Sequence, residues 1–197
     1  MSLASYISSH KKSHIIFDFD ATLVLINVDW LDLAKAMRED ILELDEELWK
    51  EHENTARVSP LLTGLQEKHG DKGRAMVLKH VTRFELQYKD SYTKNHKLLS
   101  EVAAFRDKYR MFIWSSNSRE LLEDVLRQLD MSDWFDVIVG RGDVGHIKPS
   151  PEGFELIRDP KVPLERYVLV GDSSHDEAAA KAAGIDFYKH DFFEKGR

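Results

Sequence analysis

Short apolar runs recur along this chain, and segments with helical periodicity separate them. The first run, residues 14–20, reads HIIFDFD and becomes acidic at its end. Its β-branched and aromatic side chains are typical of a buried strand. Similar runs follow at 111–114, 136–139, 167–170 and 185–188. Strands that alternate with helices predict a parallel sheet that is covered on both faces.

Two helices are predicted between the later strands. The first has one apolar face, formed by Leu121, Leu122, Val125, Leu126 and Leu129 at helical spacing. The second is the alanine-rich segment 178–183. Because both belong to the alternating part of the chain, we assign residues 1–26 and 98–197 to one α/β core domain.

The segment 27–97 breaks this alternation, because it carries no convincing strand pattern. Helical patterns fill it at 29–38, 45–53, 59–68 and 71–94. In the last of these, apolar residues recur at helical spacing, namely Val77, Val81, Phe84 and Tyr88, and we interpret this stripe as core packing. The predicted fold class is therefore α/β, with an all-α domain inserted after the first strand.

Composition narrows the classes of partner. The 197 residues suffice for a core domain that carries a smaller one. The net charge of −7 and the lack of a dense Lys/Arg block argue against nucleic acid as the main partner. No apolar run approaches the roughly 20 residues that cross a bilayer, and the first residues lack the apolar centre of a secretory signal. We therefore expect no membrane partner.

The chain contains no cysteine. This excludes disulfide bonds, thiolate nucleophiles and zinc sites with cysteine ligands, and it is typical of a cytoplasmic protein, which is the location we expect. The sequence carries no signal for an oligomeric state.

Polar residues follow four of the predicted strands. Active sites of open parallel sheets lie at the carboxyl ends of the strands, so we expect these residues at one edge of the sheet. In chain order they are Asp18, Asp20 and Thr22; Ser115, Ser116 and Asn117; Lys148; and Asp172, Ser173 and Asp176.

These residue types favour a hard cation and a phosphoryl group. Carboxylates that lie together repel one another unless a cation or a shared proton intervenes. Mg²⁺ prefers oxygen ligands and leaves room for water and substrate phosphate. A carboxylate is also a nucleophile towards phosphoryl groups, and Ser115 and Lys148 are suited to hold phosphoryl oxygens.

Each element taken alone has a plainer interpretation. A lone Asp-x-Asp is usually a surface turn or a helix cap, a serine at a strand end is usually a cap, and a single lysine is usually solvated. The segment GDSSHDE also fits a turn before a helix with acids in its first turn. We favour the functional interpretation because the four elements occur in order, each after a predicted strand.

This ordered set resembles the haloacid dehalogenase superfamily of phosphotransferases. DFDATL is similar to its first motif, IWSS to its second, HIKPSPEGF to its third and VGDSSHDEAAAKAAG to its fourth. The motifs extend from Asp18 to Gly184, nearly the whole chain. The resemblance implies a Rossmann-like core and a phosphatase with a helical cap, similar to phosphoglycolate phosphatases.

The resemblance also implies a role for each acid and a Mg²⁺ cofactor. Asp18 is expected to be the nucleophile and a magnesium ligand. Asp20 is expected to be the general acid and base and to offer its backbone carbonyl to the metal. Asp172 is the third expected ligand, and Asp176 is a supporting acid that orients metal-bound water or Lys148.

The remaining motif residues are expected to hold the substrate or to support the site. The resemblance makes Lys148 the residue that neutralises charge on Asp18 and on the phosphoryl group. Thr22, Ser115, Ser116 and Asn117 are the expected substrate-binding residues, and Ser173 is a supporting one. The helical segment 27–97 corresponds to a cap that closes over the site and selects the leaving group.

One residue departs from the family pattern. Ala21 follows Asp20, where many relatives carry glycine. If this position needs a positive φ, we expect the alanine to be strained by about 1 kcal/mol.

Three functions stay open at this point. The presence of Asp20 favours hydrolysis of a small-molecule phosphate ester over dehalogenation or phosphonate cleavage, because those members of the superfamily lack this acid. A sugar phosphomutase keeps the same acid, so isomerisation remains an alternative. A protein that keeps the fold but serves as a binding or regulatory module is a third.

Overall fold

The computed structural model describes residues 1–53 and 59–192, and the chain divides into two compact units. The core unit comprises Met1–Ile26 and Lys89–Arg197, and the helical unit comprises Asn27–Tyr88. The second boundary lies at Lys89, earlier in the chain than residue 98, where we expected the core domain to resume.

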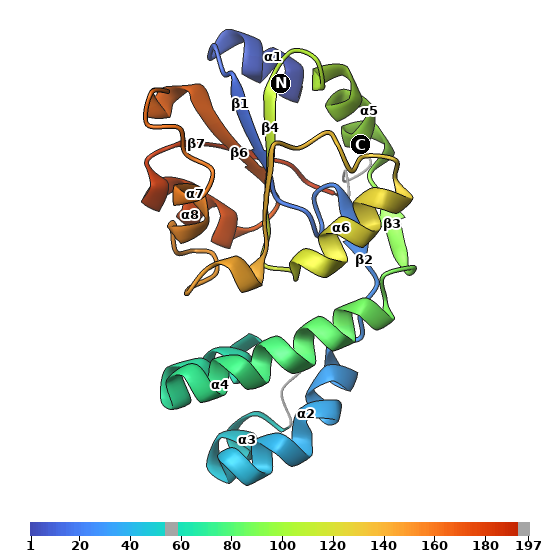
Figure 1. Cartoon of the computed structure of the whole chain (residues 1–197), viewed down its shortest axis with the longest axis vertical. Coiled ribbons are helices and arrows are strands. Elements are labelled where there is room, and N and C mark those ends of the chain that lie inside the picture. Colours follow the sequence, from blue (N-terminus) through green and yellow to red (C-terminus); the bar gives the residue numbers. More distant parts are fainter. Residues whose placement is uncertain (54–58, 193–197) are drawn as a thin grey trace. The chain divides into compact units, whose positions relative to one another are not determined.

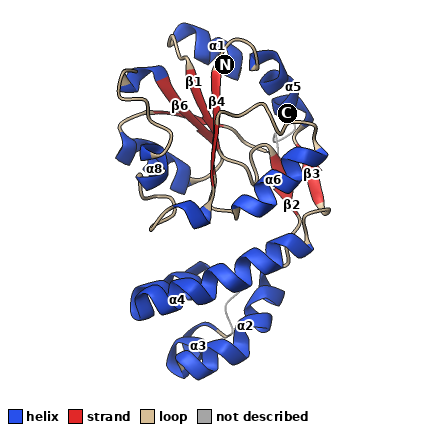
Figure 2. Ribbon diagram, in the orientation of Figure 1, coloured by secondary structure: helices blue, strands red, loops and turns tan. Residues whose placement is uncertain are grey.

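A five-stranded parallel sheet forms the centre of the core unit (Figure 2). Its strands are β1 (His14–Phe17), β4 (Arg110–Trp114), β5 (Val137–Val139), β6 (Tyr167–Gly171) and β7 (Asp186–Lys189). They lie in the order β5-β4-β1-β6-β7, and every pairing in this sheet is parallel. All five correspond to the apolar runs, and the prediction of an α/β Rossmann-like core is confirmed.

Helices cover both faces of this sheet, with α7 and α8 on one side and α5 and α6 on the other (Figure 1). The core unit contains α1 (Leu3–Ser9), α5 (His96–Phe105), α6 (Arg119–Gln128), α7 (Glu152–Glu155) and α8 (Ser174–Ala183), with short 3₁₀ turns at Arg141–Asp143 and Leu164–Arg166. Side chains alternate between the faces of a strand. In β4, Phe112 and Trp114 accordingly pack in one buried cluster with Phe154 of α7 and Ala179 and Ala180 of α8.

The apolar stripe of α6 is buried as its spacing predicts. Leu121, Leu122, Val125 and Leu126 are each fully buried. Complete burial of such a side chain contributes about 1.5–3 kcal/mol, so the face that periodicity identifies is the one that attaches α6 to the sheet.

A two-stranded antiparallel sheet carries the chain out of the core unit and back into it. It pairs β2 (Val24–Ile26) with β3 (Tyr92–Lys94). The expectation of no strand between residues 27 and 97 is therefore wrong at β3. The cause is local: β3 is three residues long and largely exposed, so no apolar alternation marks it, and its backbone pairing with β2 defines it.

The helical unit consists of α2 (Trp30–Leu44), α3 (Glu46–His52) and α4 (Ser59–Gln87). Gly70 interrupts α4 with φ 52° and ψ −130°, a conformation that suits glycine. The two arms of α4 correspond to the predicted helices 59–68 and 71–94, but the second arm ends at Gln87. Val77, Val81 and Phe84 are buried as predicted. Across the described residues, no helix has both the length and the apolarity that spanning a membrane requires.

Candidate active site

The carboxyl ends of four adjacent strands, β5, β4, β1 and β6, place the candidate residues at one edge of the core sheet. β1 is the middle strand, with β4 and β6 on either side. Phe17 is level with Ile113 of β4 and with Val170 of β6. Asp18 therefore lies beside Gly171, the residue that precedes Asp172. Neighbouring strands of a sheet are about 4.8 Å apart. The chain leaves β1 towards β4 and β5 and returns to β6 on its other side, so this edge is a topological switch point, where open sheets bind ligands.

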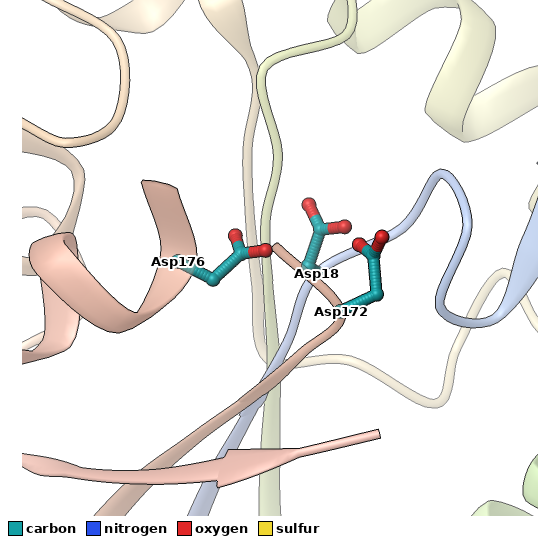
Figure 3. Close-up of side chains that lie close together, drawn as sticks. All are labelled: Asp18, Asp172 and Asp176. Atoms are coloured by element: carbon teal, nitrogen blue, oxygen red, sulfur yellow. The ribbon is translucent and has the colours of Figure 1, made fainter. Parts of the chain in front are cut away.

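Three carboxylates converge at this edge (Figure 3). One oxygen from each of Asp18, Asp172 and Asp176 lies within 4.8 Å of the others. Asp18 follows β1, Asp172 follows β6, and Asp176 is in the first turn of α8. The sequence predicted that these acids meet, and the topology of the sheet is the reason that they do.

Lys148 lies between two of the three acids. Its Nζ is 2.6 Å from Asp18 Oδ1 and donates a second hydrogen bond to Asp176 Oδ1. Lys148 is 6% exposed, Asp18 6% and Asp176 1%. Burial lowers the pKa of Lys148, but the charges of Asp18 and Asp176 outweigh burial and hold the pKa above its ordinary value. The ammonium group therefore stays charged and neutralises part of the acidic cluster.

The acids nevertheless keep an excess of negative charge. Burial, followed by repulsion from Asp176, raises the pKa of Asp172 to about 6. Burial also raises the pKa of Asp18 to about 6, because Lys148 offsets burial and repulsion from Asp176 only in part. Burial would raise the pKa of Asp176 as well, but Lys148 and the hydrogen bonds of Ser173 hold it below its ordinary value. A bound cation would reduce the repulsion between these carboxylates.

The donor set fits Mg²⁺. The three converging groups are carboxylates, and hard divalent cations take oxygen ligands. Asp176 already accepts hydrogen bonds from Lys148 and Ser173. Asp18 likewise accepts hydrogen bonds from Lys148 and Thr22. The candidate ion site therefore comprises all three carboxylates.

The loop after β1 positions Asp20 and Thr22 differently. Thr22 Oγ1 donates to Asp18 Oδ2 at 3.2 Å. Asp20 Oδ1 instead accepts the backbone N–H groups of Ala21 and Ile26, at 3.0 and 2.8 Å. The Asp20 carboxylate is thus outside the group of three converging acids, although its charge contributes to the raised pKa of Asp172.

Ala21 has a positive φ of 57°, the conformation in which a side chain is strained. The position after Asp20 therefore does need a positive φ, which is the case in which we expected the alanine to be strained. The two hydrogen bonds of Asp20 Oδ1 span this turn and help to hold its conformation.

The loop after β4 holds the predicted phosphate-binding residues. Ser115 and Asn117 are buried and Ser116 is half-buried. Ser115 Oγ donates to Asn117 Oδ1 at 2.9 Å and accepts the Asn117 N–H at 3.2 Å. The Ser115 N–H donates to the carbonyl of Val139 at the end of β5. The loop is therefore fixed to the end of β5, on the side of β4 that faces away from β1.

Ser173 and Asp176 form a capping box at the start of α8. Ser173 Oγ accepts the Asp176 N–H at 3.2 Å, and Asp176 Oδ2 accepts the Ser173 N–H at 3.0 Å. A side chain at Gly171 would lie 2.7 Å from Asp176 Cβ, so the glycine leaves the room that Asp176 occupies. The supporting role predicted for Asp176 thus has a structural basis, since one oxygen caps the helix and the other holds Lys148.

Comparison with known proteins identifies the family of the chain. The sequence pattern of haloacid dehalogenase-like hydrolases matches residues 15–189. The chain belongs to this family. The matched residues include all four strand ends that carry the candidate site residues.

Several curated proteins are similar to this haloacid dehalogenase-like hydrolase. The phosphoglycolate phosphatase of Aquifex aeolicus is 29% identical over 177 residues, 86% of this chain and 80% of that protein. The pyrophosphatase PpaX of Bacillus cereus is 24% identical over 192 residues, 95% of this chain and 87% of that protein. A PpaX protein of Caldanaerobacter subterraneus is 33% identical over 132 residues, but the match spans only 58% of its length.

A solved structure has the same fold. CbbY from Rhodobacter sphaeroides, determined in complex with phosphate, superimposes with a TM-score of 0.62 at 23% identity. The match covers 94% of this chain and 90% of CbbY.

Sequence reasoning missed one residue that shapes the site of this hydrolase. Glu152 Oε2 accepts the backbone N–H groups of Gly145 and His146, at 2.7 and 2.9 Å, and Oε1 contacts His146 Nδ1 at 2.5 Å. Glu152 thereby closes the loop that carries Lys148. An acid directly after a proline that begins a helix was the available signal.

Proposed function

We propose that this hydrolase is a magnesium-dependent phosphatase that cleaves a small-molecule phosphate monoester through an aspartyl phosphate on Asp18. One observation carries the proposal: Asp18 is buried, faces Asp172 and Asp176, and has one oxygen on Lys148 and the other on Thr22. Because these contacts already fix the Asp18 carboxylate, it loses little conformational freedom when it attacks an electrophile.

In the first step, an Asp18 carboxylate oxygen attacks phosphorus and the bond from phosphorus to the ester oxygen breaks. Asp20 gives a proton to the leaving oxygen, which departs as an alcohol. Because Asp20 Oδ1 accepts two backbone N–H groups, we assign the proton to Oδ2. Mg²⁺, held by Asp18, Asp172 and the backbone carbonyl of Asp20, would supply positive charge against the phosphoryl oxygens.

In the second step, Asp20 takes a proton from water, and the water oxygen attacks the aspartyl phosphate. Inorganic phosphate leaves and the Asp18 carboxylate is restored. Lys148 keeps its proton throughout and acts as a fixed positive charge, as its raised pKa supports.

Ser115, Ser116 and Asn117 are proposed to hold the phosphoryl oxygens from the β4 side. Ser115 lies one residue beyond Trp114 at the carboxyl end of β4, the strand next to β1. Its hydroxyl and the neighbouring backbone N–H groups are hydrogen-bond donors suited to a phosphoryl group.

The helical unit is proposed to act as the cap that selects the leaving group. It is inserted between the Asp18 loop and the β4 loop, and it has an apolar core of its own. The named relatives act on phosphoglycolate and pyrophosphate. We therefore place the substrate among small phosphate compounds of this kind.

The test is phosphate release from a panel of small phosphate esters and pyrophosphate, with and without Mg²⁺. We expect release that needs Mg²⁺ and that Asp18→Asn abolishes. Asp20→Asn should slow breakdown of the intermediate, so that acid quenching with labelled substrate traps aspartyl phosphate. Isomerisation of a sugar phosphate without net release would establish a mutase instead, and full turnover by Asp20→Asn would refute the acid/base assignment.

A further inference from the structure

Asn95 joins three segments of the core unit beside the candidate active site. It is buried, with 8% of its surface exposed. Its Oδ1 accepts the backbone N–H of Leu98 at 3.1 Å, so that Asn95 caps α5. Its Nδ2 lies 2.9 Å from the carbonyl oxygen of Thr22 and 2.8 Å from Nε2 of His190.

The partners of Asn95 determine which way its amide points. The N–H of Leu98 can only donate, and the carbonyl of Thr22 can only accept, so Oδ1 and Nδ2 cannot exchange places. Since Nδ2 can only donate, Nε2 of His190 accepts. The ring of His190 must therefore be neutral with its proton on Nδ1.

One branch of this network leads to the proposed nucleophile. The Thr22 carbonyl that Asn95 holds belongs to the residue whose hydroxyl donates to Asp18 Oδ2. The backbone N–H of Asn95 also donates to the carbonyl of Leu23, at 3.0 Å. Asn95 thus holds the loop after β1 at two consecutive residues.

The other branch leads to the second proposed metal ligand. The backbone N–H of His190 donates to the carbonyl of Gly171, at 2.8 Å. Gly171 ends β6 and directly precedes Asp172. Asn95 and His190 therefore connect the loop after β1 to the end of β6.

We propose that Asn95 is a positioning residue for catalysis, which holds the loop of Asp18 in register with the strand end that carries Asp172. This inference rests on the proposed phosphatase function. A helix cap needs only the Oδ1 acceptor, and aspartate or serine supplies such an acceptor equally well. The two donations from Nδ2 require an amide, and they go to Thr22 in the loop after β1 and to His190 after β7, not to α5.

Two variants separate positioning from capping. Asn95→Asp keeps the shape and the acceptor for Leu98 but replaces the donor that faces Thr22 by a carboxylate oxygen. Ser2→Ala removes a cap from α1, where Ser2 Oγ accepts the N–H of Ser5 at 3.2 Å. We expect kcat to fall about tenfold or more in Asn95→Asp, as when outer partners of metal ligands are removed, with a much smaller change in KM. Ser2→Ala should keep kcat.

Two measurements do not depend on turnover. Two-bond ¹⁵N–¹H NMR of the wild type should show His190 as the Nδ1–H tautomer. The N–H groups of Leu23 and Val24, which donate to the carbonyl of Phe19, should exchange with solvent faster in Asn95→Asp than in Ser2→Ala or the wild type.

An Nε2–H tautomer in the wild type would overturn the proposal, as would wild-type kcat in Asn95→Asp. If the wild type hydrolyses no phosphate ester, the proposed function fails, and amide exchange then decides the role of Asn95. Unchanged exchange in Asn95→Asp would show that it does not hold the loop, whereas faster exchange would support it.

Discussion

The two units of this hydrolase differ in the number of charged side chains that they bury. In the core unit, Asp18, Asp176 and Lys148 are buried together at the strand ends. In the described part of the helical unit, Glu85 is the one buried charged side chain, and the core is otherwise apolar. Among its ion pairs, Lys50 with Glu46 lies at the surface and His69 with Asp45 is partly buried.

This difference coincides with the position of the candidate active site, which lies in the core unit. Burying charge is costly unless partners compensate it. The core unit also buries Lys12 and Arg141. At the carboxyl ends of the strands, however, it buries two carboxylates around one lysine, and the raised pKa of Asp18 and Asp172 indicates that the charges there are not fully compensated. Local rules of stability are commonly broken at functional sites.

The largest effect is expected for Asp18→Asn. Turnover should fall by at least about 10³-fold, as when a nucleophile is removed from other enzymes, because the amide cannot form the covalent intermediate. The fold should persist, since Lys148 keeps Asp176 as a partner. Phosphate release and circular dichroism measure the two outcomes. Asp133→Asn, at an exposed pair with Arg106, is the control that should keep full activity.

Lys148→Met tests the buried network directly. It leaves Asp18 and Asp176 without their shared cation, so we expect the free energy of unfolding to fall by about 3 kcal/mol and turnover to collapse. Lys50→Met breaks an exposed pair and should leave the free energy of unfolding almost unchanged. Urea unfolding of both variants compares them, and equal losses would contradict the contrast between the units.

Mg²⁺ should stabilise the protein more as the pH rises. The pKa of Asp18 and of Asp172 is about 6 when folded, above the ordinary 3.8, so the folded protein binds more protons than the unfolded chain between these values. Without Mg²⁺, their contribution to stability therefore falls as pH rises from about 4 to about 6. Mg²⁺ binds the deprotonated acids and should offset this loss.

The measurement is the rise in Tm on adding Mg²⁺, compared at about pH 5 and about pH 7.5. Taking the difference with and without Mg²⁺ at each pH cancels titration outside the site. An equal rise at both pH values would show that these acids do not bind the ion.

The smallest effect concerns the turn between Asp20 and Thr22. Ala21→Gly relieves the strain of a positive φ but raises the conformational entropy of the unfolded chain. We therefore expect the free energy of unfolding to rise by about 0.5 kcal/mol. Ala103→Gly, at an exposed position in α5, should instead lower stability by about 1 kcal/mol. Urea unfolding distinguishes the two signs, and a loss in Ala21→Gly would show that the turn is not strained.

Much of the core unit was predictable because its signals are local. The apolar runs located all five strands of the parallel sheet, and the rule for strand ends led to Asp18, Lys148, Asp172 and Asp176. The short strand β3 was missed, because pairing with β2 rather than its own sequence defines it.

The sequence by itself determined the alternation of strands and helices, the inserted helical unit and the identity of the acids at the strand ends, since each depends on neighbouring residues. Only the tertiary structure decided that Lys148 is shared by Asp18 and Asp176 and that Asp20 Oδ1 accepts backbone N–H groups. The same holds for the connection that Asn95 and His190 make between the loop after β1 and the end of β6. The physical reason is distance along the chain. Lys148 and Asp18 are 130 positions apart, and only the parallel pairing of the strands brings them to one edge.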